Sequence, residues 1–599
     1  MRRGGKVLVL FMNKEKLEMM RHSAAHVLAA AVLELYPTAK FGVGPVIENG
    51  FYYDLDLEKK LTIADLPKIE SKMKEIIKRS LPFEKEEMSR DEAIKLFEQF
   101  RQPYKLELLR EGTVGEEGKM ESLGGRVTIY KTGKFTDLCR GPHVPTTKAI
   151  GVFKLTTVAG AYWRGDEKKP MLQRIYGVAF ETQKELDEYL KMVKEAEERD
   201  HRKIGEELDL FHIDEDVGAG LPLWHPKGAL LRQLIEDYWI DKHYKNGYEL
   251  VRTPHIGNLR LWETSGHWGF YRENMYSPIE IEGEKYLLKP MNCPFHIKIY
   301  KSRMRSYRDL PMRWAELGTV YRYERSGTLH GLTRVRGFTQ DDAHIICRHD
   351  QFEKELELVL KFAKEMLGSF GFKDYKIYLS LRDPKDTKKY VGENKVWDFA
   401  EKILQKVLDK VKFKYQIDVG EAKFYGPAVD IKICDALGRE WQCSTLQLDL
   451  NLPARFKMEF VNQQGQRETP IMLHRTLLGS LERFIAVLIE HYAGAFPTWL
   501  APVQVAVIPV GKRHVKPALK LVKVLREEGI RVHLDDVNET VGYKIRKAEK
   551  QKAPYMLVIG DKEENGKKLN VRVRGKQKTV AMTVKKFIEK VKQEIKKRK

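Results

Sequence analysis

The stretch from residue 313 to residue 347, RWAELGTVYRYERSGTLHGLTRVRGFTQDDAHIIC, constrains the fold of this chain more than any other. Two runs that alternate apolar and polar residues flank a turn at Ser326-Gly327. This pattern is typical of two antiparallel strands joined by a long loop. Five arginines lie in or beside the runs: Arg313, Arg322, Arg325, Arg334 and Arg336.

These arginines favour a phosphate-handling site. A guanidinium group presents a planar pair of donors that usually meets carboxylates or phosphates. An arginine-rich surface hairpin would explain the charges alone. It would not explain the polar string from Gln340 to His344, which lies in a run that looks buried.

The charge of the chain is concentrated near its C-terminus. Residues 500–599 hold 27 Lys and Arg against 11 Asp and Glu, which is +16 of the net +22. An excess confined to one terminal part points to a polyanion, most plausibly RNA or DNA. At 599 residues the chain should hold about four domains of ~150 residues each.

The cysteines and the N-terminus predict a cytoplasmic protein. The five cysteines form no CxxC pair and make an odd count, which suits a reducing compartment. The apolar run from Val7 to Met12 is too short for a signal-peptide core, and no stretch reaches membrane-spanning length.

Two pairs of chemically active residues share a spacing of four. Residues 15–36 form a predicted helix that Pro37 ends, and His22 and His26 lie on one face of it. Cys139 and His143 repeat the spacing beside Asp137. These residue types suit either metal binding or hydrolysis, and two unrelated structural pairs are the alternative.

The remaining segments predict strands, helices and one linker. A charged helix over 181–205 reads as a linker, and 218–256 reads as a helix followed by a strand, YELVRTP. Residues 420–450 predict further antiparallel strands, and 471–493 a strand that becomes an apolar helix. From residue 499 onward strands and helices alternate, which predicts a compact α/β domain. No Walker-type GxxxxGK[ST] loop is present.

Eight strings occur along the chain in this order: RHSAAH, TDLCRGPH, AYWRGD, LKPMNCP, GFTQDDAHI, FYGP, WQCSTLQLD and HRTLLGSLERF. From about residue 15 to the end, the chain resembles the threonyl-tRNA synthetases, a family of class II aminoacyl-tRNA synthetases. The resemblance implies an α+β multidomain protein with an antiparallel catalytic sheet. Its implied parts are an α+β editing domain (1–180), a linker helix (181–205), a class II catalytic domain (206–498) and an α/β anticodon-binding domain (499–599).

The implied reaction joins L-threonine to tRNA(Thr) through threonyl-adenylate, with ATP as a substrate. Arg322 would hold the α-phosphate and the threonine carboxylate, and Arg483 the terminal phosphates with Mg²⁺. Fixed arginines and a metal suit this chemistry because negative charge spreads over phosphate oxygens without a protein nucleophile. The other implied ATP contacts are Glu324, Arg334, Phe338 and Gln447. The alternative is a non-catalytic, synthetase-like RNA-binding regulator.

Cys293, His344 and His474 match the family's ligands for one zinc ion. Three protein ligands leave an open position, which the amino and hydroxyl groups of threonine would fill. Valine lacks the hydroxyl group, and a site that requires a polar group on its substrate rejects an analogue without that group by about 10⁴-fold or more. Serine keeps the hydroxyl group, so we expect the site to accept some serine in place of threonine. The other implied threonine-binding residues are Met291, Gln340, Asp342, Tyr425, Gln442 and Thr445.

The resemblance also implies how serine errors are corrected. His22, His26, Cys139 and His143 match the pocket that hydrolyses seryl-tRNA(Thr), with Asp137 as support, although a second metal at this quartet stays open. The implied anticodon readers are Asn538, Arg546, Glu563 and Arg572. A homodimer through 218–256 is expected from the resemblance alone.

The chain departs from the family pattern in four places. The small ubiquitin-like domain with which bacterial members usually begin is expected to be missing. Phe295 stands where glycine commonly follows NCP, Ala428 where lysine often follows FYGP, and Thr476 where a small residue often follows HR. The three substitutions concern the shape of the predicted pocket.

Overall fold

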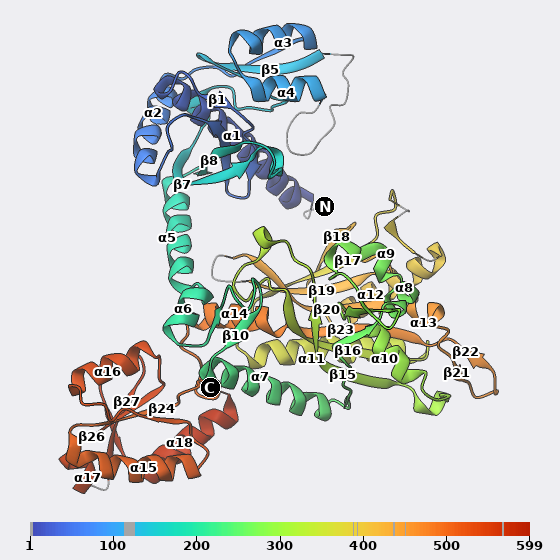
Figure 1. Cartoon of the computed structure of the whole chain (residues 1–599), viewed down its shortest axis with the longest axis vertical. Helices are drawn as coiled ribbons and strands as arrows, with labels where there is room; N and C mark the ends of the chain where they lie inside the picture. Colours follow the sequence, from blue (N-terminus) through green and yellow to red (C-terminus); the bar gives the residue numbers. More distant parts are fainter. Residues whose placement is uncertain are drawn as a thin grey trace. The chain divides into compact units, whose positions relative to one another are not determined.

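The computed structural model describes residues 4–112, 126–386, 389–391, 393–434, 438–449, 451–565 and 568–598. The chain forms two compact units, Met1–Val193 and Lys194–Lys599 (Figure 1). Among the helices of these described ranges, none is long and apolar enough to cross a bilayer.

The first unit is built around helix α1 (Gly4–Leu35), which begins well before residue 15 and ends ahead of Pro37 as predicted. Residues 24–32 of α1 are buried on every side, as expected of an apolar helix inside a core. Helix α2 (Leu66–Lys78) packs beside it against a sheet ordered β1-β3-β8-β7, with β2 on β3. The strands are β1 (Lys40–Phe41), β2 (Val46–Ile47), β3 (Gly50–Asp56), β7 (Val152–Tyr162) and β8 (Met171–Phe180).

A smaller sheet completes the first unit. Its order is β4-β5-β6, and helices α3 and α4 supply its own apolar core. The elements are β4 (Glu84–Ser89), α3 (Arg90–Gln99), α4 (Pro103–Glu111), β5 (Arg126–Thr132) and β6 (Phe135–Leu138).

The prediction of a single linker helix over 181–205 is wrong. It is two helices, α5 (Gln183–Arg199) and α6 (His201–Glu207). The break falls at Asp200, whose carboxylate accepts a hydrogen bond of 2.8 Å from the backbone N–H of Arg202. An aspartate in this N-cap position satisfies a free N–H and starts a new helix.

The second unit contains an eight-stranded sheet ordered β11-β15-β16-β23-β20-β19-β17-β18. The pairs β11/β15 and β17/β18 are parallel and the others antiparallel, which confirms the predicted hairpins. The predicted strand YELVRTP shortens to the two residues of β11. The strands are β11 (Glu249–Leu250), β15 (Met312–Tyr321), β16 (Gly337–Cys347), β17 (Tyr375–Leu381), β18 (Gln416–Val419), β19 (Ala428–Cys434), β20 (Glu440–Asp449) and β23 (Ile471–Ser480).

Helices α7 (Pro226–Lys245), α11 (Phe352–Ser369), α12 (Asn394–Lys410) and α14 (Leu481–Tyr492) cover one face of this sheet and contribute residues to its apolar core. On the other face, α10 (Cys293–Tyr300) and α13 (Leu452–Arg455) pack over Trp314, Ile346 and Met472 beside a site. Around the sheet lie β9 (Phe211–Ile213), β10 (Pro222–Trp224), β12 (Ile256–Asn258), α8 (Arg260–Ser265), α9 (His267–Tyr271), β13 (Ile279–Ile281), β14 (Glu284–Leu288), β21 (Phe460–Val461) and β22 (Arg467–Glu468).

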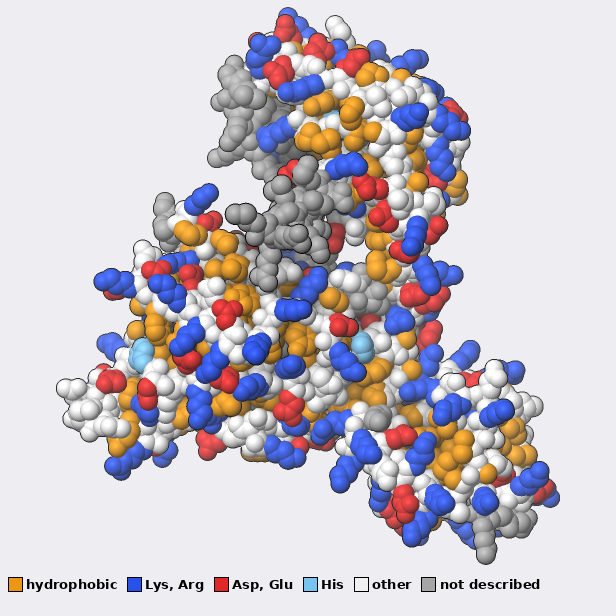
Figure 2. All heavy atoms as spheres, turned by 180° about the vertical axis from the view of Figure 1, so that it is seen from behind, with side chains coloured by type: hydrophobic (Ala, Val, Ile, Leu, Met, Phe, Trp, Pro, Cys, Tyr) orange, Lys and Arg blue, Asp and Glu red, His pale blue; other side chains and the backbone are white. Residues whose placement is uncertain are grey.

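The C-terminal part is the predicted α/β domain. Its sheet is ordered β25-β24-β26-β27-β28; α15 and α18 pack on one face and α16 on the other. Figure 2 shows Lys and Arg side chains over the visible face of this domain, at the lower right. The elements are β24 (Val505–Pro509), α15 (Val515–Glu527), β25 (Val532–Leu534), α16 (Val541–Lys550), β26 (Tyr555–Ile559), α17 (Asp561–Asn565), β27 (Leu569–Val573), β28 (Val580–Met582) and α18 (Val584–Lys597).

Candidate active sites

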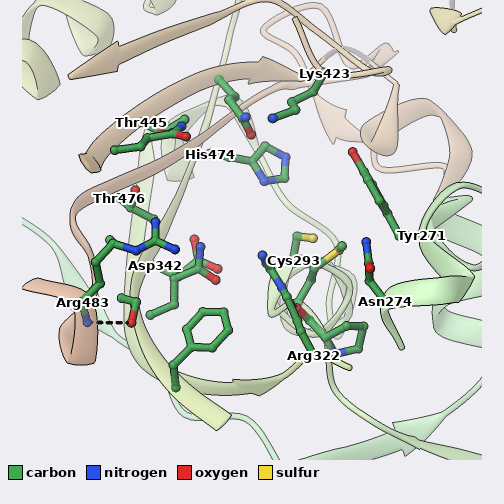
Figure 3. A pocket seen from close by; sticks show the side chains of 18 of the residues that line it. Tyr271, Asn274, Cys293, Arg322, Asp342, Lys423, Thr445, His474, Thr476 and Arg483 are labelled. Carbon is green, nitrogen blue, oxygen red and sulfur yellow. Dashed lines mark hydrogen bonds between the residues drawn. The ribbon is translucent and has the colours of Figure 1, made fainter. Parts of the chain in front are cut away.

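A cavity of about 380 Å³ lies on the face of the eight-stranded sheet that carries His344 and His474 (Figure 3). The residues predicted to bind ATP and threonine all line it, as do Cys293 and His474, whereas His344 is fully buried beside it. The lining residues among these predictions are Met291, Arg322, Glu324, Arg334, Phe338, Gln340, Asp342, Tyr425, Gln442, Thr445, Gln447 and Arg483.

Strand register explains why distant parts of the sequence meet here. His344 on β16 pairs with His474 on β23, and Asp342 pairs with Thr476 two residues away. Because side chains alternate between the faces of a strand, residues two apart reach the same face. Asp341 points the other way, and its carboxylate accepts hydrogen bonds from the backbone of β23.

Two of the positively charged residues that line the cavity are the predicted phosphate-binding arginines, Arg322 and Arg483. The guanidinium of Arg322 lies 5.2 Å from the ring centre of Phe338, and its Nε donates to the carbonyl of Pro290 at 3.4 Å. Arg483, in the first turn of α14, donates from Nε to the carbonyl of Thr333 at 3.0 Å. Burial lowers the pKa of both arginines from the ordinary value. An arginine nevertheless stays charged in proteins, so the cavity suits an anionic ligand.

The polar groups near the threonine-binding prediction are held by hydrogen bonds. Asp342 accepts from the Asn292 amide at 3.1 Å, and Gln442 donates to the Thr445 hydroxyl at 2.7 Å. The Tyr425 hydroxyl donates to the Gln447 side-chain oxygen at 2.5 Å. Such fixed side chains present a rigid surface to a small ligand.

Three buried donors converge at one end of the cavity. The ligand atoms of Cys293, His344 and His474 lie within 4.8 Å of one another, and His344 Nε2 is 3.0 Å from His474 Nδ1. Burial, followed by the charge of nearby groups, keeps the pKa of His344 well below its ordinary value. Its imidazole is therefore neutral and has a lone pair to offer.

The outer nitrogens of both histidines have buried partners. His474 Nε2 is 2.8 Å from Asp449 Oδ2, and His344 Nδ1 is 2.7 Å from His296 Nδ1. His296 in turn contacts Glu316 at 3.1 Å. Partners of this kind fix the tautomer of a metal-binding histidine and aim its other nitrogen.

The thiol of Cys293 is consistent with the same interpretation. Burial, and then Asp342 and Asp449, raise its pKa well above the ordinary value. A cation bound beside the sulfur would remove the proton. One sulfur and two imidazoles beside a cavity fit Zn²⁺ with a free coordination position.

A second cluster lies in the first unit. His22 and His26 come from α1, Cys139 and His143 follow β6, and the ligand atoms of the four lie within 4.8 Å of one another. Cys139 Sγ is 3.2 Å from His22 Nε2 and 3.3 Å from His143 Nε2. The two predicted pairs are therefore one site, and the alternative of unrelated pairs is wrong.

Asp137 anchors this second cluster. Its carboxylate lies 3.3 Å from His26 Nε2, accepts from the Tyr53 hydroxyl at 2.5 Å and forms an ion pair with Lys105. Tyr53 and Lys105 are both buried. Sequence reasoning missed them because β3 and α4 carry no motif that marks either residue.

The chemistry of the second cluster is that of neutral groups. Burial lowers the pKa of His22, His26 and His143. It also raises the pKa of Cys139 to about 12. The imidazoles are therefore neutral at neutral pH and each has a lone pair that can accept a hydrogen bond from water, whereas the thiol does not form a thiolate nucleophile.

Further cavity residues also escaped prediction. Lys423, His267, Tyr271 and Asn274 line the cavity, and the Lys423 side chain points into it (Figure 3). The only signal for Lys423 was its place directly before FYGP.

The three residues that depart from the family pattern lie at different distances from the cavity. Thr476 lines the cavity and donates to the carbonyl of Cys443 at 3.3 Å. Ala428 is buried in β19 opposite Gln447. Phe295 packs against Trp262, with ring centres 5.9 Å apart, outside the cavity lining. Only Thr476 therefore alters the lining directly.

The predicted anticodon readers lie on separate segments of the C-terminal domain. Asn538 and Arg546 are exposed, before and on α16. Glu563 on α17 accepts from the Asn570 amide at 2.7 Å. Arg572 on β27 lies 3.9 Å from Glu549, which leaves its guanidinium weakly held.

Three family models match successive parts of the chain. The threonyl and alanyl tRNA synthetase second additional domain matches residues 127–176. The tRNA synthetase class II core domain (G, H, P, S and T) matches 276–492, and the anticodon binding domain matches 504–594.

Curated relatives match nearly the whole chain. A threonine--tRNA ligase of Dehalococcoides mccartyi (strain CBDB1) is 56% identical over 558 residues, covering 93% of each protein. A threonine--tRNA ligase of a Sulfurihydrogenibium species (strain YO3AOP1) is 53% identical over 584 residues, covering 97% of this chain and 89% of the relative.

Solved structures give the same picture. The structure titled as the RNA binding domain of threonyl-tRNA synthetase from Cryptosporidium parvum Iowa II is 38% identical with a TM-score of 0.63, covering 66% of this chain and 98% of that one. Prolyl-tRNA synthetase of Cryptosporidium parvum, at 15% identity and a TM-score of 0.51, covers 66% of this chain and 75% of that one, and shares the fold.

Proposed function

Because the chain belongs to the threonine--tRNA ligase family, we propose that its two clusters divide one task, the selection of threonine at the cavity and the removal of serine at the second cluster. The protein is a class II synthetase that uses ATP to charge tRNA with threonine and that edits its product. The observation that supports the proposal most strongly is that Arg322 and Arg483 line the same cavity at which three possible zinc ligands meet. These ligands are Cys293, His344 and His474.

In the first step a threonine carboxylate oxygen attacks the α-phosphorus of ATP, and the bond to the leaving pyrophosphate breaks. Arg322 holds the carboxylate and the α-phosphate, and Arg483 holds the terminal phosphates that Mg²⁺ accompanies. Phe338 stacks on adenine, and Glu324 and Arg334 complete the ATP contacts. Fixed positive charge lowers the barrier because negative charge moves onto the phosphate oxygens.

Cys293, His344 and His474 would hold one Zn²⁺. Such an ion would coordinate threonine through its amino and hydroxyl groups, since three protein ligands leave it open to further ligands. Asp342 and Gln442, each already hydrogen-bonded, orient the same amino acid. A site built for a hydroxyl rejects valine strongly and serine weakly, which is why a second, hydrolytic site is needed.

At that second site, water attacks the carbonyl carbon of the ester that joins serine to tRNA. The bond from this carbon to the ribose oxygen breaks, so serine leaves as the acid and the ribose oxygen takes up a proton. His22, His26 and His143, whose side chains meet in one buried cluster, position the water and carry its proton. Asp137, held by Lys105, orients His26.

The remaining assignments follow the family. The editing domain spans 1–180, the linker 181–205, the catalytic domain 206–498 and the anticodon-binding domain 499–599. The chain pairs as a homodimer through 218–256 and works in the cytoplasm, where its cysteines, which form no disulfide in the described structure, stay reduced.

Threonine-dependent exchange of pyrophosphate into ATP tests the proposal. Metal-loaded protein should exchange with threonine and weakly with serine, but not with valine. Protein stripped by a chelator should lose the activity and recover it with zinc. Equal exchange with valine, or full exchange without metal, contradicts the zinc assignment; no exchange at all favours an RNA-binding regulator.

The anticodon assignment has its own test. Replacing Arg572 with Ala removes a guanidinium that can read a base edge, so the KM for tRNA should rise by a factor of about 5 to 150. Threonine-dependent exchange, which needs no tRNA, should be unchanged. A lost exchange activity would contradict the assignment.

A further inference from the structure

His201 joins the loop of residues 330–334 to helix α14. It is the first residue of α6 and is fully buried. Its Nε2 lies 3.0 Å from the backbone N–H of Leu332, and its Nδ1 lies 2.8 Å from Glu490 Oε1. Because the Leu332 N–H must donate, the imidazole proton lies on Nδ1 and is donated to Glu490.

The same loop contacts α14 a second time. Thr333, next to Leu332, accepts from Arg483 Nε through its carbonyl at 3.0 Å. Arg483 and Glu490 are seven residues apart on α14, which is two turns on one side of the helix. The contacts therefore form a closed path from Glu490 through His201 and the loop back to Arg483.

The loop is shaped for the close approach of the imidazole. Gly331 has a φ of +47°, and a Cβ there would lie 2.2 Å from His201 Nε2. The loop is also tied internally, because Thr333 and Arg334 donate from their N–H groups to the carbonyl of His330 at 3.0 and 3.2 Å. A displacement of Leu332 would thus move Thr333 and Arg334 with it.

A metal site is the competing interpretation of this cluster. The ligand atoms of Asp200, His201 and Glu490 lie within 4.8 Å of one another. Both nitrogens of His201, however, are engaged by protein groups. The imidazole has no lone pair left for a cation, so the cluster works as a hydrogen-bonded bridge.

We propose that His201 is a positioning residue for ATP. It touches no substrate; it fixes the loop so that the Thr333 carbonyl aims Arg483, and so that Arg334 stands beside the triphosphate. The inference rests on the proposed role of Arg483.

Two variants separate the two hydrogen bonds of His201. In His201→Asn the amide nitrogen replaces Nδ1 and keeps the bond to Glu490, but Leu332 loses its acceptor. In His201→Gln the amide oxygen reaches the place of Nε2 and keeps the bond to Leu332. We expect the KM for ATP in threonine-dependent exchange to rise about tenfold in His201→Asn and to stay near wild type in His201→Gln.

Three further measurements distinguish a positioning role of His201 from a loss of stability: the KM for threonine, the zinc content and the unfolding temperature. A parallel variant tests the proposed role of Arg483. The KM for threonine and the zinc content should be unchanged in both variants. Equal defects in the two variants that follow a lowered unfolding temperature would overturn the inference, as would an unchanged KM for ATP in His201→Asn. Arg483→Ala is measured alongside: if it retains exchange, the proposed role of Arg483 fails instead.

Discussion

The two units each bury a cluster of cysteine and histidine. We call Cys293, His344 and His474 the catalytic cluster, and His22, His26, Cys139 and His143 the editing cluster. The ring nitrogens of the two clusters have different partners. In the catalytic cluster, the outer nitrogens of His344 and His474 contact His296 and Asp449, so that the inner nitrogens face each other. In the editing cluster, the Nε2 atoms of His22 and His143 approach Cys139, while Nδ1 of His143 lies 3.1 Å from Ser23 Oγ and Nε2 of His26 lies 3.3 Å from Asp137. The ligand atoms converge within 4.8 Å in both clusters, so the two differ in the groups around them and not in their compactness.

We expect these partners to separate ion binding from proton transfer. In the catalytic cluster, the carboxylate of Asp449 holds His474 and favours a cation beside it. Histidines in contact with a thiol and a carboxylate can pass protons among themselves and to water. Composition alone could not distinguish these two outcomes, because the partners decide them.

The carboxylates near the two clusters also favour a cation at the catalytic cluster. Cys293 is close to Asp342 and Asp449, both of which raise the pKa of its thiol and favour a cation. In the editing cluster, the carboxylate of Asp137 is already paired with Lys105. An ion pair leaves less negative charge to attract a metal.

The sharpest way to break the comparison is to remove each cysteine. Cys293→Ala should abolish bound zinc and lower threonine-dependent exchange by more than the ~10–100-fold typical of losing a partner of a ligand. Cys139→Ala is the matched control and should leave both the zinc content and exchange unchanged. Metal analysis and pyrophosphate exchange measure the two; zinc lost from Cys139→Ala would mean that the editing cluster binds metal too.

The second test removes proton transfer. His22→Ala combined with His26→Ala should slow hydrolysis of seryl-tRNA(Thr) by about 10²–10⁴-fold, the usual contribution of general acid–base groups. Aminoacylation with threonine should be intact, because the cavity lies in the other unit. Deacylation of preformed seryl-tRNA measures the effect, and unchanged serine clearance would refute the role of the histidines.

Local patterns in the sequence predicted the strands, and the resemblance to the family supplied the residues that line the cavity. The alternation in 313–347 gives β15 and β16, and it separates Asp342 and His344 from Asp341 on the opposite face. The family strings then led to the zinc-type set, whose members are far apart in the sequence and meet only through the register of β16 with β23.

The partners of these residues could not be predicted. Lys105, Tyr53 and His201 act through contacts that span tens to more than a hundred residues, and no spacing marks such contacts. The break at Asp200 was missed because its charged neighbours all favour helix. The side-chain cap that ends one helix and starts the next is a single hydrogen bond.

A milder test of the difference between the two clusters changes only the carboxylate that holds a histidine in each. Asp449→Asn keeps all three donors but weakens the acceptor that fixes His474, so zinc affinity should fall about 10–100-fold. Asp137→Asn, the matched change beside His26, should leave zinc affinity unchanged and slow only seryl-tRNA hydrolysis. Competition with a chelator measures the affinity, and an equal effect of both variants would contradict the distinction.

The smallest expected effect is a dependence of stability on pH. Burial keeps the pKa of His26 well below its ordinary value of 6.5, so the folded state leaves it neutral while the unfolded chain binds a proton. The free energy of unfolding should therefore fall as the pH drops below about 6.5, by up to ~1.4 kcal/mol per pH unit from this residue. His26→Asn cannot titrate and should lose less stability between about pH 7 and pH 5. Urea unfolding at the two pH values measures the difference, and equal losses in the variant and the parent protein would show that His26 is not held neutral.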